Sequence, residues 1–295
     1  MNSTSRYSKQ PQARRGLTLL ELVVVLVIMS ALAGVAIRMT GRVADQSRYE
    51  ATQRTLEEVR DAIVGPTVAP TTEASAAVAS FVADVGRPPT GLDELLANVN
   101  NLPLFEVIPA ADTGQPHADV LVPRGWRGPY VRLPVGAATI RDGWGRDLVT
   151  TVDGSTSLLT QMASLGADGL LDTVGGTSDY NRDSIVEFPP AAYRGVMITG
   201  KVYKLVSGER MPPTGGVLTI TLFSPDPSGA APRGVLSVPA TLTVDAMTSD
   251  VTFRIETPTV GPRILRAAID GVPVGSPKYV VVRPGETIVV DLRVQ

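Results

Sequence analysis

The length, composition and charge of the chain limit what it can be. Its 295 residues are 43% hydrophobic, which suits an ordinary core and about two domains. A formal net charge of −2 provides no basic field for nucleic acid, so we expect no nucleic-acid partner. The lack of cysteine excludes disulfides and thiolate chemistry, and the single histidine, His117, excludes sites that need more than one imidazole, such as multi-histidine zinc sites. His117 lies in a loop-like stretch and is expected to be a solvated loop residue and not a catalyst. We therefore expect a protein that is not an enzyme.

The N-terminus carries the strongest pattern. Residues 1–16 contain four basic side chains and no acidic one, and residues 17–37 form an almost unbroken apolar run. A helix of about 20 apolar residues matches the hydrocarbon thickness of a bilayer. We predict a transmembrane helix over 17–37, with its basic end in the cytoplasm and the rest of the chain outside it. The run exceeds the roughly 7–15 apolar residues of a secretory signal peptide and ends in no clean small-x-small cleavage site.

Glu21 stands at the start of this apolar run. A carboxylate inside a membrane segment costs about 2.5–3.5 kcal/mol, and such a residue usually marks function. At the membrane interface the cost is small, so an interfacial position would explain why the residue is tolerated. It would not explain the pattern around it.

The string Arg14-Arg15-Gly16-Leu17-Thr18-Leu19-Leu20-Glu21 resembles the N-terminal signal of type IV pilins and type II secretion pseudopilins. The resemblance implies a leader peptide over 1–16, cleavage between Gly16 and Leu17 by a prepilin peptidase, and N-methylation of Leu17. Leucine stands where the family usually has phenylalanine. Pairing of the Glu21 carboxylate with the new α-amine of Leu17 in a neighbouring subunit would neutralise both charges and fix the register between subunits.

Beyond residue 37 the pattern becomes amphipathic and stops at Gly65-Pro66, which predicts one long helix over 17–65. We expect residues 66–188 to form a small globular domain with an antiparallel β-sheet. Four segments in this domain resemble the major pseudopilin of type II secretion systems, in the correct order, with Gly143 where that family has proline. These segments are residues 81–96, 126–134, 142–146 and 164–169.

The loop after residue 164 is rich in glycine and aspartate. Carboxylate and carbonyl oxygens are the ligands that Ca²⁺ prefers. The resemblance implies a calcium ion here, with Asp168, Asp179 and Asp183 as ligands, and a solvated acidic turn without an ion is the alternative. An EF-hand is excluded, because Ser184 replaces the turn glycine and Pro190 occupies the position of the bidentate glutamate.

Residues 189–295 alternate apolar and polar side chains in short runs separated by turn signals, which predicts a β-sandwich. This part loosely resembles transthyretin-like or carboxypeptidase-regulatory-like modules. The expected fold class is therefore α+β: a long N-terminal helix, a small pseudopilin-like domain over 66–188, and an all-β sandwich over 189–295.

Two functions agree with this sequence. The first is a structural subunit of a type II secretion pseudopilus that supports protein export. Its partners would be the membrane, prepilin peptidase, other pseudopilins, further copies of itself and a secreted substrate. It would cross the inner membrane once, with its globular domains in the periplasm of a Gram-negative bacterium. The alternative is a pilin-anchored periplasmic or surface binding module, or a type IV pilus minor pilin, which presents the sandwich to a partner.

Overall fold

The computed structural model describes most of the chain after the predicted leader. The described residues are 19–66, 79–109, 119–171, 179–213, 216–226, 235–243 and 251–294, with backbone only at 35–40 and 235–243. Contacts divide the chain into two compact units, Met1–Ser47 and Arg48–Gln295. The predicted leader, both residues of the predicted cleavage site (Gly16 and Leu17) and His117 lie outside the described residues.

The first element is one long helix, α1 (Leu19–Val64). From residue 19 to residue 34 every side chain is exposed, and most are apolar. Within the described part of the chain, no helix is both long enough and apolar enough to cross a bilayer. The predicted membrane segment, 17–37, extends beyond the residues whose side chains are described.

The second half of α1 is amphipathic. Leu56, Val59 and Ile63 are buried on one face because helical spacing places them together, while Glu57 on the opposite side is exposed. The helix ends at Gly65, whose left-handed backbone (φ 92°) stops it. The prediction of a single helix that ends at Gly65-Pro66 is confirmed from residue 19 onward.

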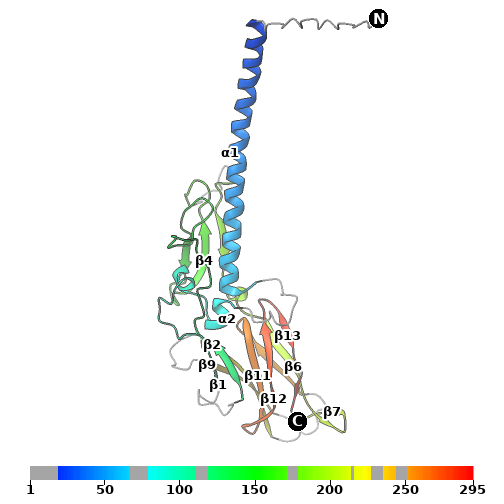
Figure 1. Ribbon diagram of the computed structural model, residues 1–295. Helices are drawn as coiled ribbons and strands as arrows, with labels where there is room; N and C mark the ends of the chain where they lie inside the picture. Colours follow the sequence, from blue (N-terminus) through cyan, green and yellow to red (C-terminus); the bar gives the residue numbers. More distant parts are fainter. Residues whose placement is uncertain are drawn as a thin grey trace, which may run out of the picture. The chain divides into compact units, whose positions relative to one another are not determined.

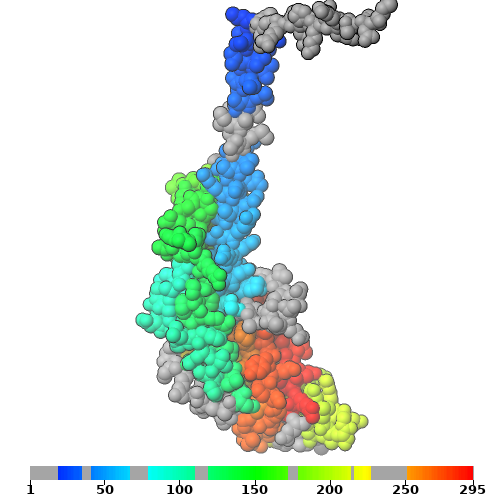
Figure 2. Space-filling view, in the orientation of Figure 1, coloured from blue at the N-terminus to red at the C-terminus, as the bar shows by residue number. Residues whose placement is uncertain are grey.

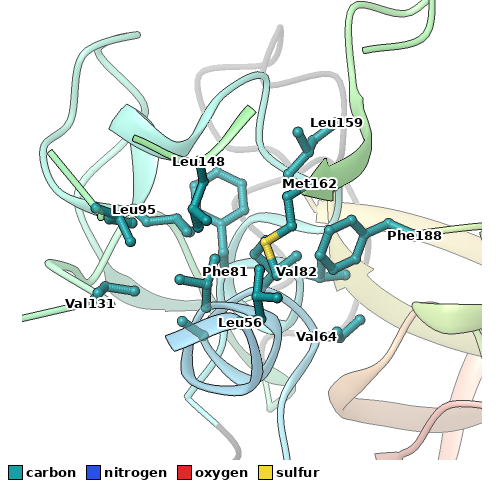
Figure 3. Packing of buried hydrophobic residues seen from close by; sticks show 14 of the residues in the cluster. Leu56, Val64, Phe81, Val82, Leu95, Val131, Leu148, Leu159, Met162 and Phe188 are labelled. Atoms are coloured by element: carbon teal, nitrogen blue, oxygen red, sulfur yellow. The ribbon is translucent and has the colours of Figure 1, made fainter. Parts of the chain in front are cut away.

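A small α+β region follows α1 in the chain. It contains α2 (Phe81–Val85), the 3₁₀-helix η2 (Leu92–Leu95) and an antiparallel sheet of β3 (Val149–Val152), β4 (Leu159–Ser164) and β5 (Ser184–Glu187) in the order β3-β4-β5. Buried side chains of α2, η2 and β4 form a core around Phe81 and Met162, Val186 of β5 packs against it partly buried, and Leu56 of α1 lies within it (Figure 3). The predicted antiparallel sheet is confirmed.

Hydrogen bonds to the Glu94 carboxylate stabilise the 3₁₀-helix η2 and the turn before it. Arg87 donates to both of its oxygens at 3.0 Å, and the Thr90 N–H donates to one of them at 2.8 Å. Glu94 is buried, so its charge needs these partners. Burial raises the pKa of Glu94, but the hydrogen bonds from Arg87, Asn100 and Thr90 outweigh it and hold the pKa below its ordinary value.

The C-terminal part is a two-layered β-structure (Figure 1). One sheet has the order β10-β6-β13, with β7 and β14 also paired to β6, and the other has the order β12-β11-β8-β9. The short 3₁₀-helix η4 (Pro190–Ala192) precedes them. The strands are β6 (Met197–Val206), β7 (Glu209–Met211), β8 (Val217–Pro225), β9 (Val235–Thr243), β10 (Val251–Glu256), β11 (Gly261–Ile269), β12 (Val272–Val282), β13 (Thr287–Val289) and β14 (Leu292–Arg293).

Both sheets contribute to one core. In β10, Val251, Phe253 and Ile255 are buried and the residues between them are exposed, as a period of two requires. They pack with side chains of β8 such as Ile220. The two sheets therefore pack face to face, as the predicted β-sandwich requires. The run over 288–294 alternates without a break in the sequence, but in the structure it is split into β13 and β14, which both run parallel to β6.

The pair β1 (Glu106–Pro109) and β2 (Leu121–Arg124) lies against the four-stranded sheet. Val120 and Val122 form a separate buried cluster with Phe223 of β8 and Ile264 of β11. In addition, Val260 lies in the core around Phe81. Packing thus continues across the boundary predicted between residues 188 and 189.

Gly143 explains a departure from the family pattern. A Cβ atom at this position would lie 2.0 Å from the carbonyl oxygen of Arg48 in α1, and the Gly143 N–H donates to Thr52 Oγ1 at 3.0 Å. Proline has a Cβ atom and no N–H, so it cannot replace this glycine.

We predict that Gly143→Ala lowers the free energy of unfolding by about 1–3 kcal/mol, because the added methyl group pushes the loop away from α1. The matched control is Gly154→Ala, where nothing lies within 4 Å of the added Cβ atom. Denaturant unfolding of both variants measures the difference. Equal stabilities would show that the loop adjusts freely.

Candidate assembly and ligand-binding sites

The start of α1 is the first candidate site. Its side chains from Leu19 to Leu32 are apolar on every side of the helix apart from Glu21 and Ser30, and all are exposed. Such a surface is stable only among lipids or other apolar helices. Ser30 donates its hydroxyl to the Val27 carbonyl at 2.9 Å, so even this polar group is satisfied within the helix.

Glu21 occupies the first turn of α1. A carboxylate at this end is favourable because the helix dipole is positive there. The predicted mature N-terminus, Leu17, precedes it by about one helical turn but lies outside the described residues, as does Gly16. The structure therefore places the predicted assembly residue at the beginning of an exposed apolar helix.

The second candidate site is the loop that follows β4. Asp142 links the end of β4 to the turn over residues 142–146. Its Oδ1 accepts hydrogen bonds from the N–H groups of Trp144 and Arg146 at 3.0 and 2.9 Å. Its Oδ2 accepts one from the Ser164 hydroxyl at 2.6 Å. The Arg146 guanidinium then donates to the carbonyl oxygens of Gly166 and Ala167, at 2.5 and 2.9 Å. A side-chain cation thus already holds these two carbonyl groups.

The three predicted calcium ligands, Asp168, Asp179 and Asp183, do not form one cluster of acidic side chains in the described part of the chain. The Ala167 N–H donates to the Tyr180 carbonyl at 2.7 Å, which brings the two ends of the loop together. Asp179 and Asp183 line one cavity of about 240 Å³, which Arg182 also lines. Asp168 is exposed, and its Oδ1 accepts a hydrogen bond from the Leu170 N–H at 3.0 Å.

These described donors do not by themselves fit a calcium ion. No three acidic or histidine side chains gather anywhere in the described ranges, and Arg146 already bonds two loop carbonyls. Residues 172–178, in the middle of the loop, lie outside those ranges. The calcium site stays a prediction of the sequence.

A buried polar cluster at α2 was not predicted. The Asp84 side chain is only 2% exposed, and its oxygens accept hydrogen bonds from Arg127 at 3.0 Å and from the Tyr130 hydroxyl at 3.2 Å. Burial raises the pKa of Asp84 to about 6, although Arg127 and Tyr130 oppose the shift. Burial also raises the pKa of Tyr130, helped by the nearby Asp84 charge.

Arg263 extends this cluster into the sandwich. It is fully buried, and its guanidinium donates to the carbonyls of Ala83 and Pro262 at 3.2 and 2.8 Å and to the Thr259 hydroxyl at 3.0 Å. Burial lowers the pKa of Arg263 to about 9, and the Asp84 carboxylate opposes that shift. Asp84 and Arg263 are 179 positions apart in the printed sequence, so no local pattern could have paired them.

Residues 11–37 match the family described as the prokaryotic N-terminal methylation motif. This is a type IV pilin-like signal, and it implies processing by a prepilin peptidase, membrane anchoring and assembly with pilin-like subunits. The match supports the pilin-like interpretation of the predicted cleavage site and of Glu21. It ends at residue 37 and assigns no family to the globular part of the chain.

Other comparisons add little. No curated protein matches the chain. A crystal structure of a protein from Bacteroides fragilis, provisionally described as a cell adhesion protein, is 10% identical and covers 64% of this chain and 73% of that chain. Its TM-score is 0.20, so this similarity carries no argument about fold or function.

We predict that Asp84 makes stability depend on pH. Its pKa is raised from 3.8 to about 6 in the folded protein, so its contribution to stability is complete below pH 4 and is lost as the pH rises through 6. The loss amounts to roughly 3 kcal/mol between pH 4 and pH 7. Denaturant unfolding across this range should show the decline in the wild type and not in Asp84→Asn.

Asp147→Asn is the control for this pH dependence, because that carboxylate is exposed. Hydrogen bonding from Thr139 and the charge of Arg141 lower the pKa of Asp147 further, so it titrates below this window. The variant should keep the wild-type slope. If Asp84→Asn also keeps the wild-type slope, the decline of stability with pH does not come from Asp84.

The calcium hypothesis predicts heat of binding when the full chain is titrated with CaCl₂. Saturation at about 100 times the dissociation constant should raise stability by about 2.7 kcal/mol. Asp168→Asn should abolish the heat, and Asp93→Asn, an exposed carboxylate outside the loop, should leave it unchanged. An absence of heat from the wild-type chain would contradict the calcium site.

Proposed function

We propose that the chain is a structural subunit of a type II secretion pseudopilus. In this role it is cut between Gly16 and Leu17, methylated at Leu17, held in the inner membrane of a Gram-negative bacterium and assembled through α1, with its globular part in the periplasm. It supports protein export and is not an enzyme. The observation that carries the proposal is the methylation motif over residues 11–37, which runs into an exposed apolar helix with Glu21 in its first turn.

The chemistry of Glu21 supports assembly through α1. When apolar helices pack together, a lone carboxylate among them loses its hydration and costs several kcal/mol. The α-amine created at Leu17 is the nearest charge of opposite sign that cleavage supplies. A pair between the two, from neighbouring subunits, removes both costs and is satisfied in one axial register only.

A second candidate is favoured by the sandwich. It has a core of its own, distinct from the core around Phe81, and this core requires no part of α1. A pilin-type anchor, including a minor pilin of a type IV pilus, would use such a module to present a binding surface to a partner. The two roles are compatible, since a filament subunit can also display a module.

We predict that Glu21→Ala reduces the yield of assembled filaments at least tenfold, because the α-amine of Leu17 is left without its partner. The variant should still be inserted in the membrane. Electron microscopy and sedimentation of sheared filaments from cells that make the variant measure the effect.

The matched control for this test is Glu57→Ala, an exposed glutamate further along α1, which should assemble normally. Mass spectrometry of each mature chain should find a methylated N-terminus at Leu17. Normal filaments in Glu21→Ala would favour the display role over assembly. An uncleaved N-terminus in the wild-type chain would remove the basis of both.

A further inference from the structure

A pocket lies at one corner of the sandwich. Its volume is about 510 Å³, within the usual range for small-molecule sites, and strands from both sheets line it. Its walls come from β6, β12, β14 and the residue before β14. The lining residues are Tyr203, Gly275, Ser276, Pro277, Lys278, Asp291, Leu292 and Arg293.

Two cations of this pocket have no acidic partner among the described residues. Lys278 and Arg293 are both exposed, and neither forms an ion pair within that part of the chain. Lysine is rare in this protein, at positions 9, 201, 204 and 278, so three of the four lysines belong to the sandwich. In a chain of net charge −2, this corner is therefore locally basic.

The one carboxylate of the pocket is already compensated. Asp291 Oδ2 accepts a hydrogen bond from Arg210 Nη1 at 3.0 Å, and Oδ1 accepts one from the Lys201 N–H at 3.1 Å. A carboxylate offers about four acceptor positions. Asp291 thus keeps acceptor capacity for hydroxyl groups of a ligand, while its charge is balanced by Arg210.

Tyr203 supplies a firmly held aromatic ring. The Arg210 guanidinium carbon lies 4.4 Å from the centre of this ring, and Arg210 is fixed in turn by Asp291. Arg293 is the register partner of Tyr203 across the parallel strands β14 and β6. Figure 2 shows the yellow-green surface around β7 beside the red surface of the C-terminal strands.

We propose that this pocket binds an acidic sugar, such as one uronate residue of a polysaccharide. The carboxylate of the sugar pairs with Lys278 and Arg293, its hydroxyl groups donate to Asp291, and its ring lies against Tyr203. A phosphate chain fits less well, because it lacks the sugar hydroxyl groups that could donate to Asp291 and has no ring to lie against Tyr203. The proposal rests on the display role of the sandwich and requires no filament.

The test is calorimetric titration of the full chain, in a non-ionic detergent, with trigalacturonate. Neutral maltotriose and inorganic phosphate are titrated separately. We expect trigalacturonate to bind, with weaker binding at higher salt, and the two other probes to give no heat. Lys278→Gln and Arg293→Gln should each weaken binding at least tenfold. The control is Arg254→Gln, which changes an exposed arginine of β10 outside the pocket and should leave the affinity for trigalacturonate unchanged.

Thermal unfolding of each variant shows whether it is folded, and both pocket cations are exposed, so their loss should not unfold the chain. No binding of trigalacturonate by a folded wild-type chain overturns the proposal, as does equal weakening by Arg254→Gln. Phosphate binding that is lost in the same variants would identify a general anion site instead. Since the titration uses unassembled chains, failure here leaves filament assembly through Glu21 untouched.

Discussion

The fully buried guanidinium of Arg263 is the constraint on which the globular part of the chain depends. A buried cation is costly unless every donor finds an acceptor, and here the acceptors come from both sides of the junction. Ala83 contributes its carbonyl from α2, and Thr259 contributes its hydroxyl from the turn before β11. The chain must bring these segments together or leave a charge in an apolar interior.

Several other features follow from this junction. Gly261 has a left-handed backbone (φ 112°), and a Cβ atom there would lie 2.6 Å from the Cβ atom of Ala83, so only glycine allows α2 to come so close. Asp84 is buried on the same short helix and takes its hydrogen bonds from Arg127 and Tyr130. Val260 then completes the core around Phe81. The small region after α1 and the sandwich therefore share one packed unit from Arg48 to Gln295.

The start of the N-terminal helix is governed by its exposed apolar surface and not by a buried charge. The exposed apolar side chains at its start are unfavourable in water, whereas the Glu21 carboxylate among them is unfavourable in lipid without a partner. The methylation motif over residues 11–37 connects both facts to a pilin-like signal. The motif ends at residue 37, and the pocket proposed as a ligand site, which Tyr203, Lys278 and Arg293 line, lies in the globular unit.

The sequence by itself determined the features that local patterns encode. The apolar run with Glu21, the helix end at Gly65 and the alternation in β10 each depend on residues a few positions apart. Tertiary structure alone decided the rest, because the partners are distant in the chain. Asp84 and Arg263 come close only after folding, Arg146 donates to the loop carbonyls of Gly166 and Ala167, and the alternating run over 288–294 divides into β13 and β14 as it pairs with β6.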